Sequence, residues 1–301
     1  MENMGINKKF WKNKKVFITG HTGFKGSWLV KTLLLLDCKI IGYSNNIPTN
    51  PSLFKLIKSN NKLKNINGDV RDANRLKKVI TNNKPDIIIH LAAQPIVQKS
   101  FEDPFLTFAS NITGTINLLE IIKNYKKKIL VLIITSDKTY EINKTKKGLV
   151  ETDPLGGEDP YSASKSCCDI IVNSYYKSFF KKHDKIFISS ARAGNVVGGG
   201  DWSPNRIITD IYFSITKSKK LLIRNPNSIR PWQYVMDVIY GYLLLIQKMN
   251  YRGHSFCGAW NFGPKSRKNF SVSEVIEVLS RYWKKINWEK DNKNWKQENN
   301  Y

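Results

Sequence analysis

The stretch Val16-Phe-Ile-Thr-Gly20-His-Thr-Gly23-Phe-Lys-Gly26-Ser-Trp28 decides the fold of this chain of 301 residues. A short apolar run, typical of a buried strand, leads into glycines spaced G-x-x-G-x-x-G, and an apolar helical pattern follows. This context is that of the dinucleotide-binding fingerprint. Gly20 would permit the tight turn, Gly23 would let backbone N–H groups approach a pyrophosphate, and Gly26 would allow close helix packing. The stretch therefore favours a dinucleotide site over a plain turn.

Strand-like and helix-like segments alternate from this stretch to about residue 194. We expect strands at residues 16–19, 39–43, 63–66, 86–91, 129–134 and 186–191, and helices at 24–36, 74–81, 105–124 and 160–180. Such alternation predicts an α/β fold, with a Rossmann-like parallel sheet and helices on both of its faces.

The pattern loosens after about residue 195, where glycines and prolines interrupt it, and helices are expected at 205–217, 234–249 and 271–283. We therefore predict two parts. Residues 1–194 form the dinucleotide-binding domain, and residues 195–301 form a smaller lobe that closes over the substrate and is interleaved with the first part.

The composition is that of an ordinary globular protein, except for a net charge of +25. The lysines are scattered and only nine residues are Arg, so a codon bias explains the charge better than nucleic-acid binding does. Cys38, Cys167, Cys168 and Cys257 lack metal-ligand spacing, so reduced thiols and no metal site are expected. No apolar leader and no membrane span are evident, which predicts a cytoplasmic protein.

Several residues after the predicted strands are candidates for holding the dinucleotide. Asn46 stands where an acid for the ribose hydroxyls is expected, and since no Arg follows that strand to hold a 2′-phosphate, NAD is favoured over NADP. Asp69 and Val70 could cap the adenine, although a turn Asp is an equal alternative. Small residues at Leu91-Ala92-Ala93 would admit the cofactor or only satisfy packing.

Asn111 is a weak helix former inside a predicted long helix. It could hold a bend or a water for proton transfer, or it could be a surface residue.

The catalytic candidates follow the apolar strand 129–134. Ser136-Asp137-Lys138 comes directly after it, at the strand end where ligands bind in α/β sheets. Tyr161 and Lys165 follow four residues apart, on one face of a predicted helix. A cationic Lys165 is expected to lower the pKa of Tyr161, which could then take the proton of an alcohol during hydride transfer.

Motifs along almost the whole chain resemble those of the extended short-chain dehydrogenase/reductases, in the NAD-dependent epimerase/dehydratase family. The glycine and Tyr-x-x-x-Lys motifs mark the superfamily only, whereas TSDK, GGGDW and RPWQ point to its CDP-hexose branch. The matching segments are 20–28 (GHTGFKGSW), 90–97 (HLAAQPIV), 111–120, 135–140 (TSDKTY), 161–165, 191–202 (ARAGNVVGGGDW), 230–235 (RPWQYV) and 259–264 (AWNFGP).

The resemblance implies loss of water from CDP-glucose to give CDP-4-keto-6-deoxyglucose, with NAD recycled. Tyr161 would take the C4 hydroxyl proton, Ser136 would bond the C4 oxygen, and Lys165 would also hold the nicotinamide ribose. We assign Asp137 to the departing C6 hydroxyl and Lys138 to the C5 proton, although the residues alone leave this division open. Implied cofactor contacts include Thr22 and Phe24, and implied substrate contacts are Gln94, Asn195, Arg206 and Arg230.

Two alternatives remain on the sequence. A nucleotide-sugar 4-epimerase of the same fold needs the Tyr–Lys pair but not the Asp137-Lys138 pair. A non-catalytic NAD-binding protein would not need either. The family usually has an Asp where Asn46 stands and a basic residue near Gln98, and it continues for several dozen residues after the equivalent of Trp288. We therefore expect a shortened lobe, and we also expect a homo-oligomer.

Overall fold

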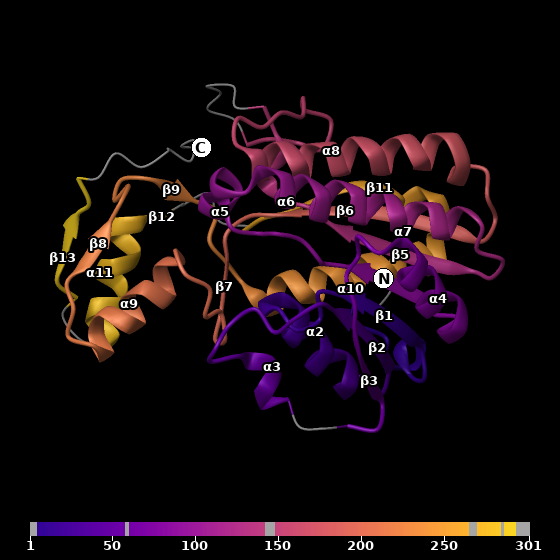
Figure 1. Cartoon of the computed structure of the whole chain (residues 1–301), viewed down its shortest axis with the longest axis horizontal. Coiled ribbons are helices and arrows are strands. Elements are labelled where there is room, and N and C mark those ends of the chain that lie inside the picture. Colours follow the sequence, from indigo (N-terminus) through magenta and orange to yellow (C-terminus); the bar gives the residue numbers. More distant parts are fainter. Residues whose placement is uncertain (1–4, 58–59, 142–147, 265–269, 284–285, 293–301) are drawn as a thin grey trace.

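The computed structural model describes residues 5–57, 60–141, 148–264, 270–283 and 286–292. Its centre is a seven-stranded sheet in the order β11-β6-β5-β4-β1-β2-β3, in which all neighbours are parallel (Figure 1). The strands are β1 (Lys15–Thr19), β2 (Lys39–Ser44), β3 (Leu63–Asn67), β4 (Ile87–His90), β5 (Ile129–Ile134), β6 (Ile186–Ala193) and β11 (Gly258–Phe262). The predicted fold class is confirmed, and the order reverses between β1 and β4, where such sheets bind ligands.

Alternating side chains of the central strands build two apolar cores, one on each face of the sheet. Val16 and Ile18 of β1 face α2 (Phe24–Leu35) and α10 (Val235–Arg252), whereas Phe17 faces the opposite helices. Those are α4 (Ala73–Asn83), α7 (Gly114–Lys123) and α8 (Pro160–Tyr175). Strands buried on both faces explain why the sequence shows continuous apolar runs instead of alternation.

Each of the two longest predicted helices contains a π-helical turn. Residues 105–124 form α6 (Pro104–Phe108), η1 (Ala109–Thr113) and α7, and residues 160–180 form α8 followed by η3 (Tyr176–Phe180). The stretch Pro104–Lys123 is long and apolar enough to cross a membrane by length and composition, and 39% of its apolar window is buried within the fold. Within this stretch, Leu118, Leu119 and Ile122 of α7 belong to the apolar core on one face of the sheet. Core helices of globular proteins can be equally long and apolar, so this stretch does not by itself indicate a membrane span.

The chain returns to the sheet after building part of the lobe. α10 packs on the face of α2, and β11 pairs with β6, so residues 235–262 belong to the central unit in space. The strand β11 was not expected from the sequence.

The lobe has a small core of its own, beside the carboxyl ends of the strands (Figure 1). It contains α9 (Ile207–Thr216), α11 (Val272–Tyr282) and the paired strands β8 (Leu221–Ile223) and β13 (Trp288–Lys290). Short strand pairs join it to the sheet: β7 (Val196–Val197) with β10 (Gln233–Tyr234), and β9 (Ile229–Arg230) with β12 (Phe270–Ser271). The remaining described helices are α1 (Lys8–Trp11), α3 (Leu53–Leu56), α5 (Val97–Glu102), η2 (Asp137–Thr139) and η4 (Gly253–Phe256).

Candidate active site

The glycine-rich turn between β1 and α2 has the geometry of a phosphate-binding loop. Gly20 has φ +72°, and a Cβ there would lie 2.8 Å from the backbone nitrogen of Ala92. A Cβ on Gly26 would lie 2.2 Å from the carbonyl oxygen of Gly20. A Cβ on Gly23, by contrast, would meet nothing closer than 3.4 Å. The chain itself thus requires Gly20 and Gly26, whereas the space above Gly23 is left for a ligand at the helix N-terminus, which suits a pyrophosphate.

The expected ribose and adenine end of this loop contains an ion pair that was not predicted. Asn46 is exposed after β2, and its carbonyl accepts a hydrogen bond from the Thr22 hydroxyl at 2.6 Å. Asp69 receives a two-pronged contact from Arg71, at 3.0 Å from Nε and 2.7 Å from Nη2. Asn45 donates to the same carboxylate at 3.2 Å. These contacts, led by the bonds from Arg71, lower the pKa of Asp69 to about 2.

Asn111 holds the loop after β4, and its burial excludes one of the sequence alternatives for that residue. Asn111 is 1% exposed, so a surface position is wrong, and it lies within the π-helical turn η1. Its Oδ1 accepts from the backbone N–H of Gln94 at 2.8 Å, and its Nδ2 donates to Ser164 Oγ of α8 at 2.8 Å. The side chain of Asn111 therefore ties the loop that contains Ala92 and Ala93 to α8.

The structure does not bring Gln94 to the substrate cavity. Its side-chain amide donates to Ile96 O and Thr107 Oγ1, and its Oε1 accepts from the Ile96 N–H at 2.7 Å. Its side-chain amide is thus occupied by Ile96 of the loop and Thr107 of α6, and the expected substrate contact by Gln94 stays a prediction. Gln98 lines the cavity in its place.

A cavity of about 280 Å³ lies between the sheet and the lobe. It brings together eight of the residues singled out from the sequence, which come from four separate regions of the chain: Phe24, Ser136, Asp137, Lys138, Tyr161, Asn195, Arg206 and Arg230. Lys165 lies behind Tyr161, 6% exposed, and its Nζ donates to Ile134 O at 3.1 Å.

The turn after β5 aims Ser136 and Asp137 into this cavity. Ser136 caps the short helix η2 by accepting from the Lys138 N–H at 3.2 Å, and its hydroxyl donates to Asp137 Oδ1 at 3.1 Å. A Cβ on Gly194 would lie 3.0 Å from Asp137 Oδ2 and 2.7 Å from Pro231, so only glycine leaves the carboxylate in place. Burial raises the pKa of Asp137 above its ordinary 3.8, against the opposing effect of Lys138, Ser136 and Arg230.

The helix α8 presents Tyr161 beside this turn. Asp159 caps the helix and Pro160 occupies its first turn, so Tyr161 stands at the start, where the helix meets the cavity. Burial raises the pKa of Tyr161 to about 12, and a hydrogen bond with Ser136 acts in the opposite direction. The charges that act on the phenol are those of Arg206, Asp137 and Asp159. Lys165 is directed to the end of β5, where its Nζ donates to Ile134 O, and its effect on the Tyr161 pKa stays a prediction.

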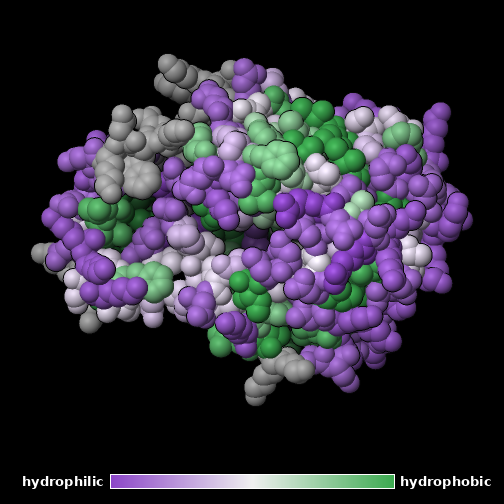
Figure 2. Space-filling model, viewed as in Figure 1, coloured by the Kyte–Doolittle hydropathy of each residue, from purple (hydrophilic) through white to green (hydrophobic). Residues whose placement is uncertain are grey.

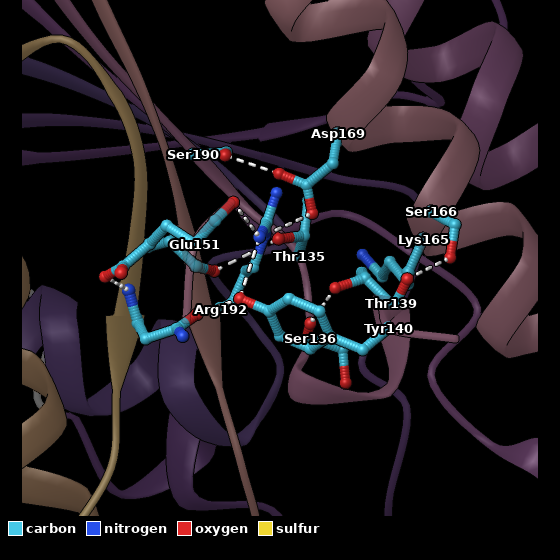
Figure 3. A network of polar contacts seen from close by, with 12 residues as sticks. Thr135, Ser136, Thr139, Tyr140, Glu151, Lys165, Ser166, Asp169, Ser190 and Arg192 are labelled. Atoms are coloured by element: carbon cyan, nitrogen blue, oxygen red, sulfur yellow. Dashed lines mark hydrogen bonds and ion pairs between the residues drawn. The ribbon is translucent and has the colours of Figure 1, made fainter. Parts of the chain in front are cut away.

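A buried polar network supports the turn and the helix from behind (Figure 3). Arg192 of β6 contacts Asp169 of α8 at 3.1 Å and Tyr140 Oη at 2.8 Å, with the guanidinium 4.9 Å from the Tyr140 ring centre. Tyr140 also donates to Asn261 of β11 at 2.6 Å. Ser166 of α8 donates to Thr139 O at 2.8 Å. The network thus joins the turn after β5 to α8, β6 and β11.

Two charged residues that the sequence analysis did not place in the site, Lys25 and Asp201, also line the cavity. Lys25, the residue between Phe24 and Gly26, lines it, and no hydrogen bond or ion pair to its ammonium comes from the described residues. Burial, followed by the charges of Lys165 and Arg206, lowers the Lys25 pKa to about 8. Arg206 lies 3.9 Å from Asp201. Lys25 could not be singled out because its position in the glycine loop predicts a phosphate contact at most.

Together, the parallel sheet, the glycine loop at the switch point and the Ser–Tyr–Lys arrangement define a dinucleotide-dependent enzyme of the short-chain dehydrogenase/reductase class. The family model of GDP-mannose 4,6 dehydratase matches residues 17–300. The chain belongs to this family of nucleotide-sugar 4,6-dehydratases.

Relatives and solved structures agree with this membership. A CDP-glucose 4,6-dehydratase of Salmonella typhimurium is 41% identical over 92% of this chain and 79% of its own length. The epimerase Mth375 of Methanothermobacter thermautotrophicus has a TM-score of 0.82 at 21% identity, over 94% of this chain and 81% of that one. A dTDP-glucose 4,6-dehydratase of Bacillus anthracis, solved in complex with NAD, has a TM-score of 0.74 at 24% identity, over 93% and 85%. These two structures establish the fold alone.

Proposed function

We propose that the chain is an NAD-dependent hydro-lyase that converts CDP-glucose to CDP-4-keto-6-deoxyglucose and water. The observation that carries the proposal is the placement of Asp137 next to Ser136 and Tyr161 in one cavity, with its pKa raised by burial. A carboxyl with a raised pKa holds its proton to a higher pH than an exposed Asp does, which favours a general acid. Loss of water from a sugar needs such an acid and 4-epimerisation does not.

The glycine loop would hold NAD, and the open space above Gly23 fits its pyrophosphate. Bound there, NAD supplies the acceptor for the hydrogen at C4 and its later donor to C6. By this proposal the predicted cofactor contacts follow the ends of the first four strands. Gly20 and Thr22 follow β1, Asn46 follows β2, Asp69 and Val70 follow β3, and residues 91–93 follow β4.

The chain's own residues move the protons. Tyr161 takes the C4 hydroxyl proton, and Lys138 takes the C5 proton once C4 is a ketone. The C5–H electrons form the C5–C6 double bond, the C6–O bond breaks, and Asp137 gives its proton to the departing hydroxyl, which leaves as water. Lys138 then returns its proton to C5. The Ser136 hydroxyl donates to Asp137 Oδ1 and acts on the pKa of Tyr161, so we propose that it relays a proton from the group that gained one to the group that lost one.

Asn195, Arg206 and Arg230 are proposed to hold the diphosphate and the sugar. Arg230 is 6% exposed, and its positive charge opposes the effect of burial on the pKa of Asp137. The charge of Arg206 opposes the effect of burial on the pKa of Tyr161. Both arginines therefore lie near the reacting end of the cavity. An Arg fork suits a diphosphate, and Lys25 adds a further cation at the same place. The lobe from about residue 195 onward is thus proposed as the substrate-binding part.

We further propose a cytoplasmic homo-oligomer that binds neither nucleic acid nor membrane. All four cysteines are free thiols, as a reducing compartment keeps them. Apolar side chains gather over α6 and α8 (Figure 2), where Phe105 and Ile170 are 80% and 53% exposed. A second copy would cover this patch. Light scattering of the wild type and of Phe105→Asp/Ile170→Asp tests this; a monomeric wild type would contradict it.

The reaction is tested by incubating the purified protein with CDP-glucose and NAD and recording proton NMR spectra. We expect the C6 hydroxymethyl signals to be replaced by a methyl signal of the 4-keto-6-deoxy product. In deuterated water, C5 of that product should carry deuterium, since Lys138 exchanges with solvent. A CDP-galactose product with its hydroxymethyl group intact would identify a 4-epimerase, and an unchanged substrate would identify a non-catalytic protein.

A further inference from the structure

The lobe contributes several apolar side chains to one part of the cavity lining, which we call the slot. Ile207 and Ile208 of α9 form part of its lining, and Leu222 and Ile223 of β8 form another part. If Arg206 and Arg230 hold the diphosphate, as the proposed function has it, the slot receives the nucleoside. Apolar walls suit the faces of a base, but they cannot distinguish one pyrimidine from another.

One carboxylate lies among these side chains, and the polar residues Thr209, Arg224, Asn225 and Ser228 also contribute to the lining. Asp210 lies in the first turn of α9, one turn after Arg206, and lines the cavity. No hydrogen bond or ion pair reaches its carboxylate from the described residues. Burial raises the pKa of Asp210 to about 6, and Arg224 is the charge that opposes this. Asp210 lines the cavity from α9 together with Ile207 and Ile208, so it lies in the part of the cavity that we assign to the nucleoside.

We propose that Asp210 accepts a hydrogen bond from the exocyclic amino group of the base and thereby selects cytosine over uracil and thymine. This inference rests on the proposed function, because it assumes that a sugar nucleotide occupies the cavity. Cytosine carries an N–H₂ donor at the position where uracil and thymine carry an acceptor oxygen. An acceptor facing the carboxylate would leave both groups without a partner, which is the arrangement that gives strong discrimination.

The test measures binding of CDP and UDP by calorimetry, with the full-length wild type, Asp210→Asn and Asp210→Ala. The wild type should bind CDP roughly tenfold or more tightly than UDP, the scale of one hydrogen bond to a charged group. An Asn side chain offers both a donor and an acceptor, so Asp210→Asn should bring the two affinities within about threefold of each other. Asp210→Ala should weaken CDP binding roughly tenfold and leave UDP binding unchanged or tighter.

Asp184→Asn is the matched control, because its carboxylate is 82% exposed; it should keep the wild-type preference. Equal affinities in the wild type, or the same CDP preference in both Asp210 variants, would overturn the inference. Turnover of CDP-glucose is recorded separately. Turnover with an unchanged preference removes the role of Asp210 and leaves the proposed function. A preference that depends on Asp210 without any turnover removes the dehydratase reaction and leaves the base-selecting residue.

Discussion

Arg192 of β6 and Asp169 of α8 form an ion pair at 3.1 Å in which the side chains are only 4% and 1% exposed. Asp169 lies one helical turn after Lys165, and Arg192 also bonds Tyr140, which follows η2. The pair therefore links the helix that carries Tyr161 to the turn that carries Asp137. Its position implies that a loss of stability and a loss of activity will go together.

Arg192→Met should lower the free energy of unfolding by about 3–5 kcal/mol, because it leaves Asp169 as a buried charge without its partner. Urea unfolding measures this. Adding Asp169→Asn should recover part of the loss, since no charge is then left unpaired. The half-exposed pair of Lys123 and Glu120, at 2.8 Å, is the control, and Lys123→Met should cost about 1 kcal/mol or less. If Arg192→Met and Lys123→Met lowered the free energy of unfolding equally, the role of the buried pair would be contradicted.

Asp137→Asn should stop the reaction after the first oxidation, because the general acid for the departing hydroxyl is gone while the groups around C4 remain. Rapid mixing with CDP-glucose should show absorbance of reduced nicotinamide that persists on the enzyme. Turnover at the wild-type rate would remove Asp137 from the mechanism.

The pH dependence of the elimination follows from the same residue. Burial raises the Asp137 pKa above 3.8, so the protonated form persists to a higher pH than in an exposed Asp. The rate of elimination should be highest below the raised pKa and should fall as pH rises through it. A rate that increases over this range would require Asp137 to act as the base.

Tyr161→Phe should lower turnover roughly a hundredfold or more, which is the scale of one positioned acid or base. The phenol makes its described contact with Ser136 at the reacting end of the cavity, so the affinity for CDP should change little. Steady-state kinetics and CDP titration measure the two effects. A near-normal rate would mean that another group takes the C4 proton.

Cofactor preference depends on Asn46 and on the pair of Asp69 with Arg71. The wild type should bind NAD more tightly than NADP, by a modest margin, because Asn46 bonds a hydroxyl without repelling a phosphate. Asn46→Asp should widen the margin. Asp69→Asn weakens the hold on Arg71 and should narrow it, since the guanidinium becomes available to a 2′-phosphate. Fluorescence titration of both cofactors measures this, and tighter NADP binding by the wild type would overturn the assignment.

Features of the fold that depend on short segments of sequence could be predicted from local patterns. The glycines at 20, 23 and 26 and the strand before Ser136 predicted the turn and the edge of the sheet where the cavity lies. The sequence did not predict β11, because Gly258–Phe262 is short, begins with a glycine and has no run of β-branched side chains, so its pairing with β6 makes it a strand. The contacts of Arg71 with Asp69, and of Lys165 with Ile134 O, depend on side-chain directions that spacing does not specify. The same is true of Gln94, whose amide folds back on its own loop.

Transfer of the C4 hydrogen to C6 within one substrate molecule is the central claim of this account. It is tested most directly with CDP-glucose deuterated at C4, incubated with the enzyme and NAD in ordinary water, followed by mass and NMR analysis of the product. We expect the deuterium in the C6 methyl group and none at C4. Deuterium found at C4 of a hexose that keeps its C6 hydroxyl would contradict the account. Loss of the deuterium to the solvent would contradict it as well.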